Sequence, residues 1–274
     1  MIDPAASATS TSSPLSPFSD VCPLVVASQT TGHAPHPMAR QLSDAVNVAA
    51  SRELQGTAPS MLDPTGWEAS LFLELRPTHR LHLTWRDFSS SGLTDAAASQ
   101  LDIAKVEFLN FRNNGLTGFV PGPATAGAIG INLANNAVTT LVFPDSGLPE
   151  LCALNISANP LDALPEGCAE RMPHLVRLHA WQCGLAALPQ DFHRLTHLRA
   201  VNLAGNRLTS LPAMPPHLRE VHLSGNDFHD IPSSLTCLHP GCHVYLHDNP
   251  LSSEAIAGWH AVRGPKPILH VPAA

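Results

Sequence analysis

The sequence predicts an α/β repeat solenoid, a horseshoe of short coils whose strands form one parallel, concave sheet between an N-terminal helical cap and a C-terminal capping helix. Three observations predict this class. A hydrophobic pattern recurs roughly every 23 residues, and an asparagine or cysteine closes each copy. Aromatic residues make up only 5% of the chain, whereas prolines number 26. Few aromatic residues with abundant leucine and proline suit a thin core of stacked layers better than one globular core.

Seven copies of the pattern L-x-x-L-x-L-x-x-N-x-L, the leucine-rich-repeat template, occupy residues 106–251. Their closing positions lie 22, 23, 24, 23, 20 and 23 residues apart. Independent amphipathic elements would not keep such a period. The closing residues are Asn114, Asn136, Asn159, Cys183, Asn206, Asn226 and Asn249.

The template gives each position a structural role. Its second and third leucine positions alternate inward on a short strand, and strands of successive coils pair in parallel. The asparagine is expected to turn inward and hydrogen-bond loop backbone, because an unsatisfied buried group costs ~1–3 kcal/mol. Cys183 takes this place once, and its weak thiol donor predicts a slightly looser coil there.

The domain organisation follows from the positions of the repeats. We expect a disordered Ser/Thr/Pro-rich segment at 1–37 and a helical N-terminal cap at 38–76. Repeats follow at 77–251. A capping helix, begun by Ser252 or Ser253 and followed by a tail, is expected at 252–274.

Two further features are expected within the repeat region. A degenerate eighth copy would precede the seven clear ones, with Leu81, Leu83 and Phe88 in its strand and turn. Proline fixes φ and lacks an N–H, so extended or polyproline return segments are expected where Leu-Pro pairs follow a repeat core. These pairs are Leu164-Pro165, Leu188-Pro189 and Leu211-Pro212, with Ile231-Pro232 as a variant.

Composition and the distribution of apolar residues and cysteines limit the partners and the location of the chain. The net charge of -7 argues against nucleic acid, which would require clustered Lys and Arg. No apolar run approaches the ~20 residues of a membrane span. The first residues lack the basic and apolar regions of a secretory signal peptide. Six scattered cysteines favour a reducing compartment over a disulfide-capped extracellular domain.

A protein-binding surface is predicted on the concave face, which the outward residues of the strands would form. Large polar and aromatic side chains gather in its C-terminal half, and Trp, Tyr and Arg are common interface anchors. Alternatively, the histidine and asparagine columns are polar residues suited to a wet sheet, and the convex side or a terminal helix makes the contact. The predicted binding residues are Arg177, His179, Trp181, Glu220, His222, His243, Tyr245 and His247.

No catalytic, metal or cofactor site is predicted. Cysteine and histidine alternate in the run from Cys237 to His243, but the repeat template already explains that segment. His193 and His197 have metal-ligand spacing without a third ligand. Glu220 and His222 could act as an acid–base pair, yet no serine or cysteine nucleophile is placed beside them.

Residues 208–226, LTSLPAMPPHLREVHLSGN, closely resemble the short repeats of bacterial effectors injected through type III secretion systems. Asn249-Pro250-Leu251-Ser252 followed by a helix is similar to the C-terminal edge of the repeats in novel E3 ubiquitin ligase (NEL) effectors, and plant-pathogen LRR ligases have similar repeats. The resemblance implies secretion into host cytoplasm and a eukaryotic host protein as partner. It does not extend to the ligase, because none of the six cysteines has an aspartate two residues later.

Two functions follow from this resemblance. In the first, the chain is a binding module that changes the activity of a host protein by occupying it. In the alternative, the chain is the substrate-recognition half of a ubiquitin ligase whose catalytic domain lies on a separate or downstream reading frame. A surface adhesin is a weaker third interpretation, since a secretory signal is not found.

Overall fold

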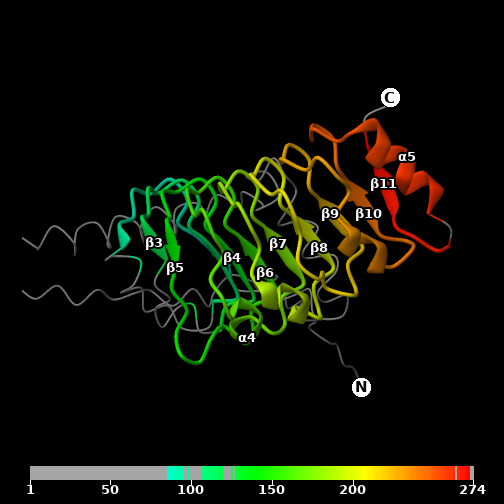
Figure 1. Cartoon of the computed structure of the whole chain (residues 1–274). Coiled ribbons are helices and arrows are strands. Elements are labelled where there is room, and N and C mark those ends of the chain that lie inside the picture. Colours follow the sequence, from blue (N-terminus) through cyan, green and yellow to red (C-terminus); the bar gives the residue numbers. More distant parts are fainter. Residues whose placement is uncertain are drawn as a thin grey trace, which may run out of the picture. The chain divides into compact units, whose positions relative to one another are not determined.

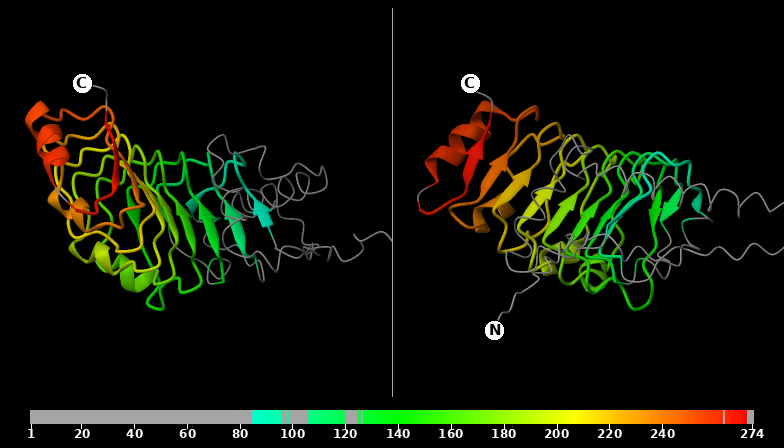
Figure 2. Two further views of the ribbon diagram at one scale, coloured as in Figure 1. Left: turned by 90° about the vertical axis from the view of Figure 1, so that its right-hand side faces the viewer. Right: turned by 180° about the vertical axis from the view of Figure 1, so that it is seen from behind.

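The computed structural model describes residues 85–95, 98, 106–119, 125, 127–262 and 264–271, all within the unit Pro35–Ala274. Within them, nine strands form one parallel sheet in the order β1-β2-β4-β6-β7-β8-β9-β10-β11. The strands lie side by side along one side of this unit and the return segments along the other (Figure 1, Figure 2). This confirms the predicted fold class. The segments expected at 1–37 and 38–76, with residues 77–84, lie outside the described residues.

Each strand is three residues long and comes from one coil. The strands are β1 (Trp85–Asp87), β2 (Phe108–Asn110), β4 (Gly130–Asn132), β6 (Ala153–Asn155), β7 (Arg177–His179), β8 (Ala200–Asn202), β9 (Glu220–His222), β10 (His243–Tyr245) and β11 (Ile268–His270). Their middle residues pair in register, as Leu178 does with Val201 and Val201 with Val221. From β2 to β10 these middle residues are buried in one hydrophobic core, because side chains alternate across a strand. The first and third residues therefore belong to the concave face.

The inward asparagines connect consecutive coils, as Asn206 illustrates. Its Oδ1 accepts hydrogen bonds from the backbone N–H groups of Cys183 (2.9 Å) and Leu185 (3.1 Å). Its Nδ2 donates to the carbonyl oxygens of Ala180 and Leu203, both at 2.8 Å. One side chain thus satisfies groups in two coils that would otherwise be buried without partners. Comparable bonds to the preceding coil are made by Asn114, Asn136, Asn159, Asn226 and Asn249.

Cys183 makes only part of this set of bonds. Its thiol donates to the carbonyl oxygen of Ile156 at 3.2 Å, but it has no amide oxygen to accept bonds from the preceding coil. Instead, the N–H of Leu161 donates to the Cys183 carbonyl oxygen at 3.1 Å. Burial raises the pKa of the Cys183 thiol to about 11, so it stays protonated at neutral pH.

A left-handed residue stands directly before the template asparagine in each coil. From Asn113 to Gln182 this residue is not glycine, with φ between 53° and 59°. Glycine takes over at Gly205 and Gly225, both with φ of 65°. An L-residue is disfavoured in this region because its Cβ approaches the following carbonyl oxygen. The turn is thus the same in all these coils, whereas its conformational cost differs.

The return segments contain short elements that the sequence did not predict: β3 (Gly118–Phe119), β5 (Thr140–Leu141), α4 (Cys168–Arg171), η3 (Gln190–Arg194) and η4 (Ser233–Cys237). Pro189 and Pro232 are extended as expected, with φ near -58° and -57°. A 3₁₀ turn rather than a longer extended segment follows each proline. The turn places one apolar side chain, Phe192 or Leu235, in the core. None of the helices in the described ranges is long and apolar enough to cross a lipid bilayer.

At the C-terminal end, α5 (Ser253–Ala261) begins at the predicted cap, where Ser252 Oγ accepts a bond from the Ala255 N–H at 3.0 Å. Its Trp259 side chain is buried against the last layer of the core. The sequence predicted only a tail after this helix. It forms β11 instead, which pairs in parallel with β10 and becomes the edge of the sheet.

The first strand also differs from expectation. The eighth copy was expected to place its strand at Leu81 and Leu83, whereas β1 is Trp85–Asp87 and pairs with β2. Phe88 accounts for this register. Its buried ring stacks on Phe111, the equivalent residue of the next coil, with centroids 5.7 Å apart.

Candidate functional site

The predicted binding residues lie where the repeat register places them, on or just after the strands at the concave face. Arg177 and His179 belong to β7, while Glu220, His222, His243 and Tyr245 belong to β9 and β10. Trp181 and His247 follow β7 and β10 by two residues. All eight are partly exposed. They do not form one cluster, however, because β8 separates β7 from β9 and presents only Ala200 and Asn202.

Three stacked rings dominate the C-terminal end of this face. His222 stacks on Tyr245 with centroids 4.5 Å apart and planes 6° apart. Tyr245 in turn stacks on His270 at 4.4 Å and 11°. These distances are close to the spacing of neighbouring strands, ~4.8 Å, which is why residues in register on β9, β10 and β11 stack face to face.

Two polar contacts complete this arrangement. The Nε2 atom of His222 lies 2.9 Å from Oε1 of Glu220. His243 Nδ1 lies 3.0 Å from His270 Nε2, and these two rings are also stacked. We call Glu220, His222, His243, Tyr245 and His270 the ring cluster. Each of its side chains is held by a polar contact or by stacking within the cluster, so its surface is ordered before any partner binds.

The electrostatic environment of the ring cluster centres on Glu220. The hydrogen bond with His222 lowers the pKa of the Glu220 carboxyl, and the positive charges of His222, Arg177 and His179 lower it further, while burial opposes them. The carboxylate is therefore ionised at neutral pH. The pKa of Cys242 shifts in the opposite direction. Burial raises it to about 11, and the negative charge of Glu220 raises it further. Cys242 thus supplies no thiolate to the Glu220–His222 pair.

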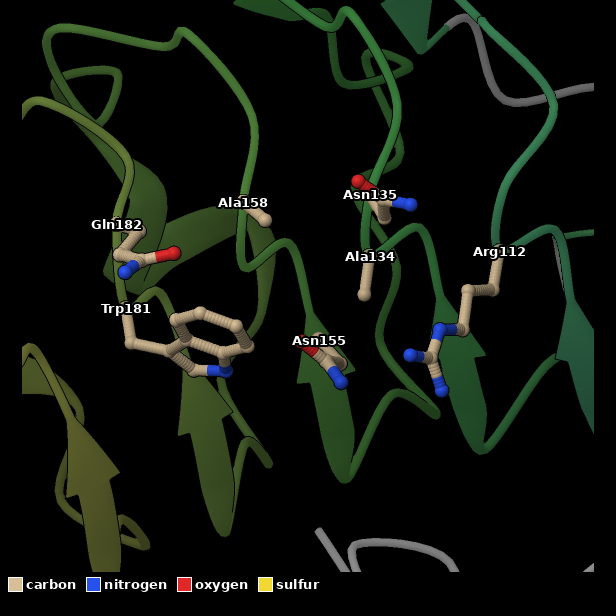
Figure 3. Close-up of a pocket in the computed structure, with 7 residues that line it drawn as sticks. All are labelled: Arg112, Ala134, Asn135, Asn155, Ala158, Trp181 and Gln182. Atoms are coloured by element: carbon tan, nitrogen blue, oxygen red, sulfur yellow. The ribbon is translucent and has the colours of Figure 1, made fainter. Parts of the chain in front are cut away.

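A hollow of ≈ 290 Å³ opens in the middle of the face, between Trp181 on one side and Arg112 on the other (Figure 3). Ala134, Ala158 and Asn155 form its floor, and Asn135 and Gln182 line its rim. Among these residues, only Trp181 was predicted to bind a partner. Arg112 could have been found, because it occupies the same template position after β2 that Trp181 occupies after β7.

In the N-terminal half of the face, the outward asparagines are buried and serve the sheet itself. Asn110, Asn132 and Asn155 each accept a hydrogen bond at Oδ1 from the N–H two residues later, at 3.0–3.2 Å. Asn202 repeats this contact on β8 at 3.1 Å. The asparagine column thus fixes the ends of the strands, and its buried members offer little surface for contact.

The structure does not bring together the possible metal ligands of the two segments considered for metal binding. Cys242 is fully buried in the core, whereas Cys237 and His239 are exposed. His193 and His197 are exposed and contact the backbone carbonyls of Gln190 and Pro173. Across the part of the chain that the structure describes, no group of three or more His, Cys, Asp or Glu side chains could hold a metal ion.

Parts of the chain are similar to known proteins. A family model described as Leucine Rich repeat matches residues 215–231, the coil that contains β9. No curated protein matches the chain. The LRR domain of a Shigella effector is 20% identical with a TM-score of 0.48, over 82% of this chain and 96% of that chain. An LRR protein of Leptospira interrogans is 20% identical with a TM-score of 0.45, over 62% and 51%. The described part of the chain has a leucine-rich-repeat fold.

Proposed function

We propose that this chain is a non-catalytic protein-binding module that engages its partner through the concave face. Leucine-rich-repeat domains are generally protein-interaction modules. The observation that carries the proposal is the ring cluster, where aromatic and charged side chains are partly exposed yet held by stacking and hydrogen bonds. Such preorganised side chains lose little conformational freedom on binding.

Trp181 extends this surface toward the middle of the sheet. Its indole extends toward Asn155 and lines the hollow together with Ala158 (Figure 3). Tryptophan and tyrosine are enriched among the residues that dominate interface energetics. Trp181 and Tyr245 therefore supply two anchors on opposite sides of β8.

We further propose that the partner is a eukaryotic host protein and that the chain reaches it as a type III secreted effector. The short bacterial repeats at 208–226 and the polar N-terminal segment support this. Occupation of a host protein requires no catalytic group on the chain, in keeping with a buried, protonated Cys242 beside Glu220. The ligase-related alternative would use the same face to select a substrate.

Affinity capture from eukaryotic lysate tests the proposal. The full wild-type chain is compared with the triple variant Trp181→Ala, His222→Ala, Tyr245→Ala. The matched control is His193→Ala, His229→Ala, His260→Ala, whose exposed side chains lie outside the sheet. We expect one host protein to be retained by the wild type and the control and lost by the face variant. Equal retention by all three would contradict binding at the concave face, and no retained protein would contradict the host partner.

A further inference from the structure

A ladder of side chains across the left-handed turns stops at the hollow. Asn113 Nδ2 donates to Ser90 Oγ at 3.4 Å, and Asn135 Nδ2 donates to Asn113 Oδ1 one coil later. The next residue of this series is Ala158, which has the same left-handed backbone but no polar side chain. Asn135 Oδ1 therefore receives no hydrogen bond from the residues that the structure describes. It is an acceptor at the rim of the hollow.

The floor and one wall of the hollow add hydrogen-bond donors. Asn155 is buried, and its Oδ1 accepts from the Ser157 N–H at 3.1 Å, whereas its Nδ2 has no acceptor within the described ranges. The indole N–H of Trp181 also has no acceptor in the described part of the chain, and the ring extends toward Asn155 (Figure 3). Gln182, one coil beyond Ala158, adds an exposed carboxamide that can donate and accept.

These groups favour a neutral ligand that carries several hydroxyls. Arg112 also lines the hollow, but it already interacts within the chain, and the other lining residues are uncharged. A hydroxyl both donates and accepts, so a set of neighbouring hydroxyls can pair with the carboxamides and the indole N–H together. An apolar side chain would displace water from the same groups without replacing their hydrogen bonds, which is unfavourable.

The Trp181 ring and the size of the hollow narrow this ligand to one sugar ring. One face of a pyranose carries C–H groups, whose slightly positive hydrogens are attracted to the negative face of an indole. The hydroxyls project from the edge of the same ring, where carboxamides can reach them. Asn135 and Gln182 stand two coils apart, roughly 10 Å, which leaves room for a ring between them. A volume of ≈ 290 Å³ is at the lower limit of small-molecule sites.

We propose that the hollow binds one neutral pyranose unit, stacked on Trp181 and hydrogen-bonded through its hydroxyls to the carboxamides of the rim and floor (Figure 3). The same chemistry is offered by a free sugar and by the terminal unit of a glycan. This site goes beyond the proposed function, because its ligand is a carbohydrate rather than a protein surface.

Saturation-transfer NMR of the full chain with glucose, galactose, mannose and N-acetylglucosamine tests the inference, together with an array of neutral glycans. We expect at least one of these sugars to bind. Binding to the free sugar that no array glycan improves would identify a free sugar as the ligand. Tighter binding to glycans that end in that sugar would identify a glycan, and both results support the site.

Ala158→Asn is the most informative variant. Asparagine tolerates the left-handed turn at this position, can continue the ladder to Asn135 Oδ1 and adds a side chain inside the hollow. We expect it to weaken sugar binding about tenfold or more while the melting temperature stays the same or rises. Trp181→Ala should weaken binding similarly. Arg194→Gln is the matched control and should bind as the wild type does, since Arg194 is exposed on η3.

Two results would overturn the inference: no neutral sugar bound in solution or on the array, or binding that persists in Ala158→Asn. The double variant His222→Ala, Tyr245→Ala tests the location, because it changes only the ring cluster. It should bind the sugar normally, and loss of the sugar in this variant would contradict the hollow as the site. Capture of a host protein that Ala158→Asn retains would leave the proposed function standing whether or not the sugar binds.

Discussion

His243 and His270 stand side by side on the last two strands, with Nδ1 of one 3.0 Å from Nε2 of the other. A hydrogen bond between two imidazoles requires one unprotonated nitrogen, because two protonated rings offer donors only. Together with the stack of His270 on Tyr245, this contact joins β11 to β10 through side chains.

We expect β11 to be held less firmly in His270→Ala, because the substitution removes both the polar contact with His243 and the stack on Tyr245. Hydrogen exchange of the Ile268 amide, which donates to Cys242 O, measures this. Identical protection in the wild type and the variant would show that the two side-chain contacts contribute nothing to the docking of β11.

Glu220→Gln should lower stability at neutral pH by less than about 1 kcal/mol, because an ion pair with partly exposed side chains is screened by water. The pKa of Glu220 is lower in the folded chain than its ordinary value of 4.5. Its contribution is thus present above that value and is lost as pH falls through the folded pKa. Denaturant unfolding of both chains should give curves that converge in acid. A stability difference that grows toward low pH would contradict the assignment.

Substitutions at the template asparagine position should act in opposite directions at Asn206 and Cys183. Asn206→Ala leaves several buried groups of two coils unsatisfied and should cost about 2–4 kcal/mol. Cys183→Asn restores an oxygen that can accept from the preceding coil and should stabilise the fold by about 1 kcal/mol. Chemical denaturation measures both changes. A destabilised Cys183→Asn would mean that the coil has adjusted its shape to the thiol.

Leu203→Ala and Trp181→Ala should differ in their effect on stability, because Leu203 lies in the core and Trp181 on the concave face. Leu203 is fully buried, and its truncation should cost ~2–5 kcal/mol. Trp181 lies on the outward side at the hollow, so its truncation should cost less than about 1 kcal/mol. Thermal unfolding of the two variants in parallel tests this, and a large loss for Trp181→Ala would place the indole among the structural contacts of the coil.

The repeat region could be predicted because one residue type recurs for one physical reason. An asparagine that satisfies backbone in two coils has few substitutes, so its spacing identifies the coils and the outward positions of each strand. Arg177, His179 and Trp181 were placed on the correct face by this register alone.

The remaining features have no such signal. β11 carries Leu269 inward but has no following asparagine, so only its position beside β10 identifies it as a strand. His270 was therefore absent from the predicted surface although it completes the stack of rings. The hollow was missed for a different reason, since it depends on small residues at Ala134 and Ala158 as much as on Arg112 and Trp181.

The left-handed turns before the template asparagines influence which coils of the array unfold first. Gly205 and Gly225 adopt this conformation without the steric cost of Ala158 or Gln182, about 1–2 kcal/mol for an L-residue. Contacts in a solenoid are made with nearest neighbours, so such differences remain local. Resistance to opening should therefore be graded from coil to coil, with the greatest persistence in the coils of Gly205 and Gly225, the second of which carries His222.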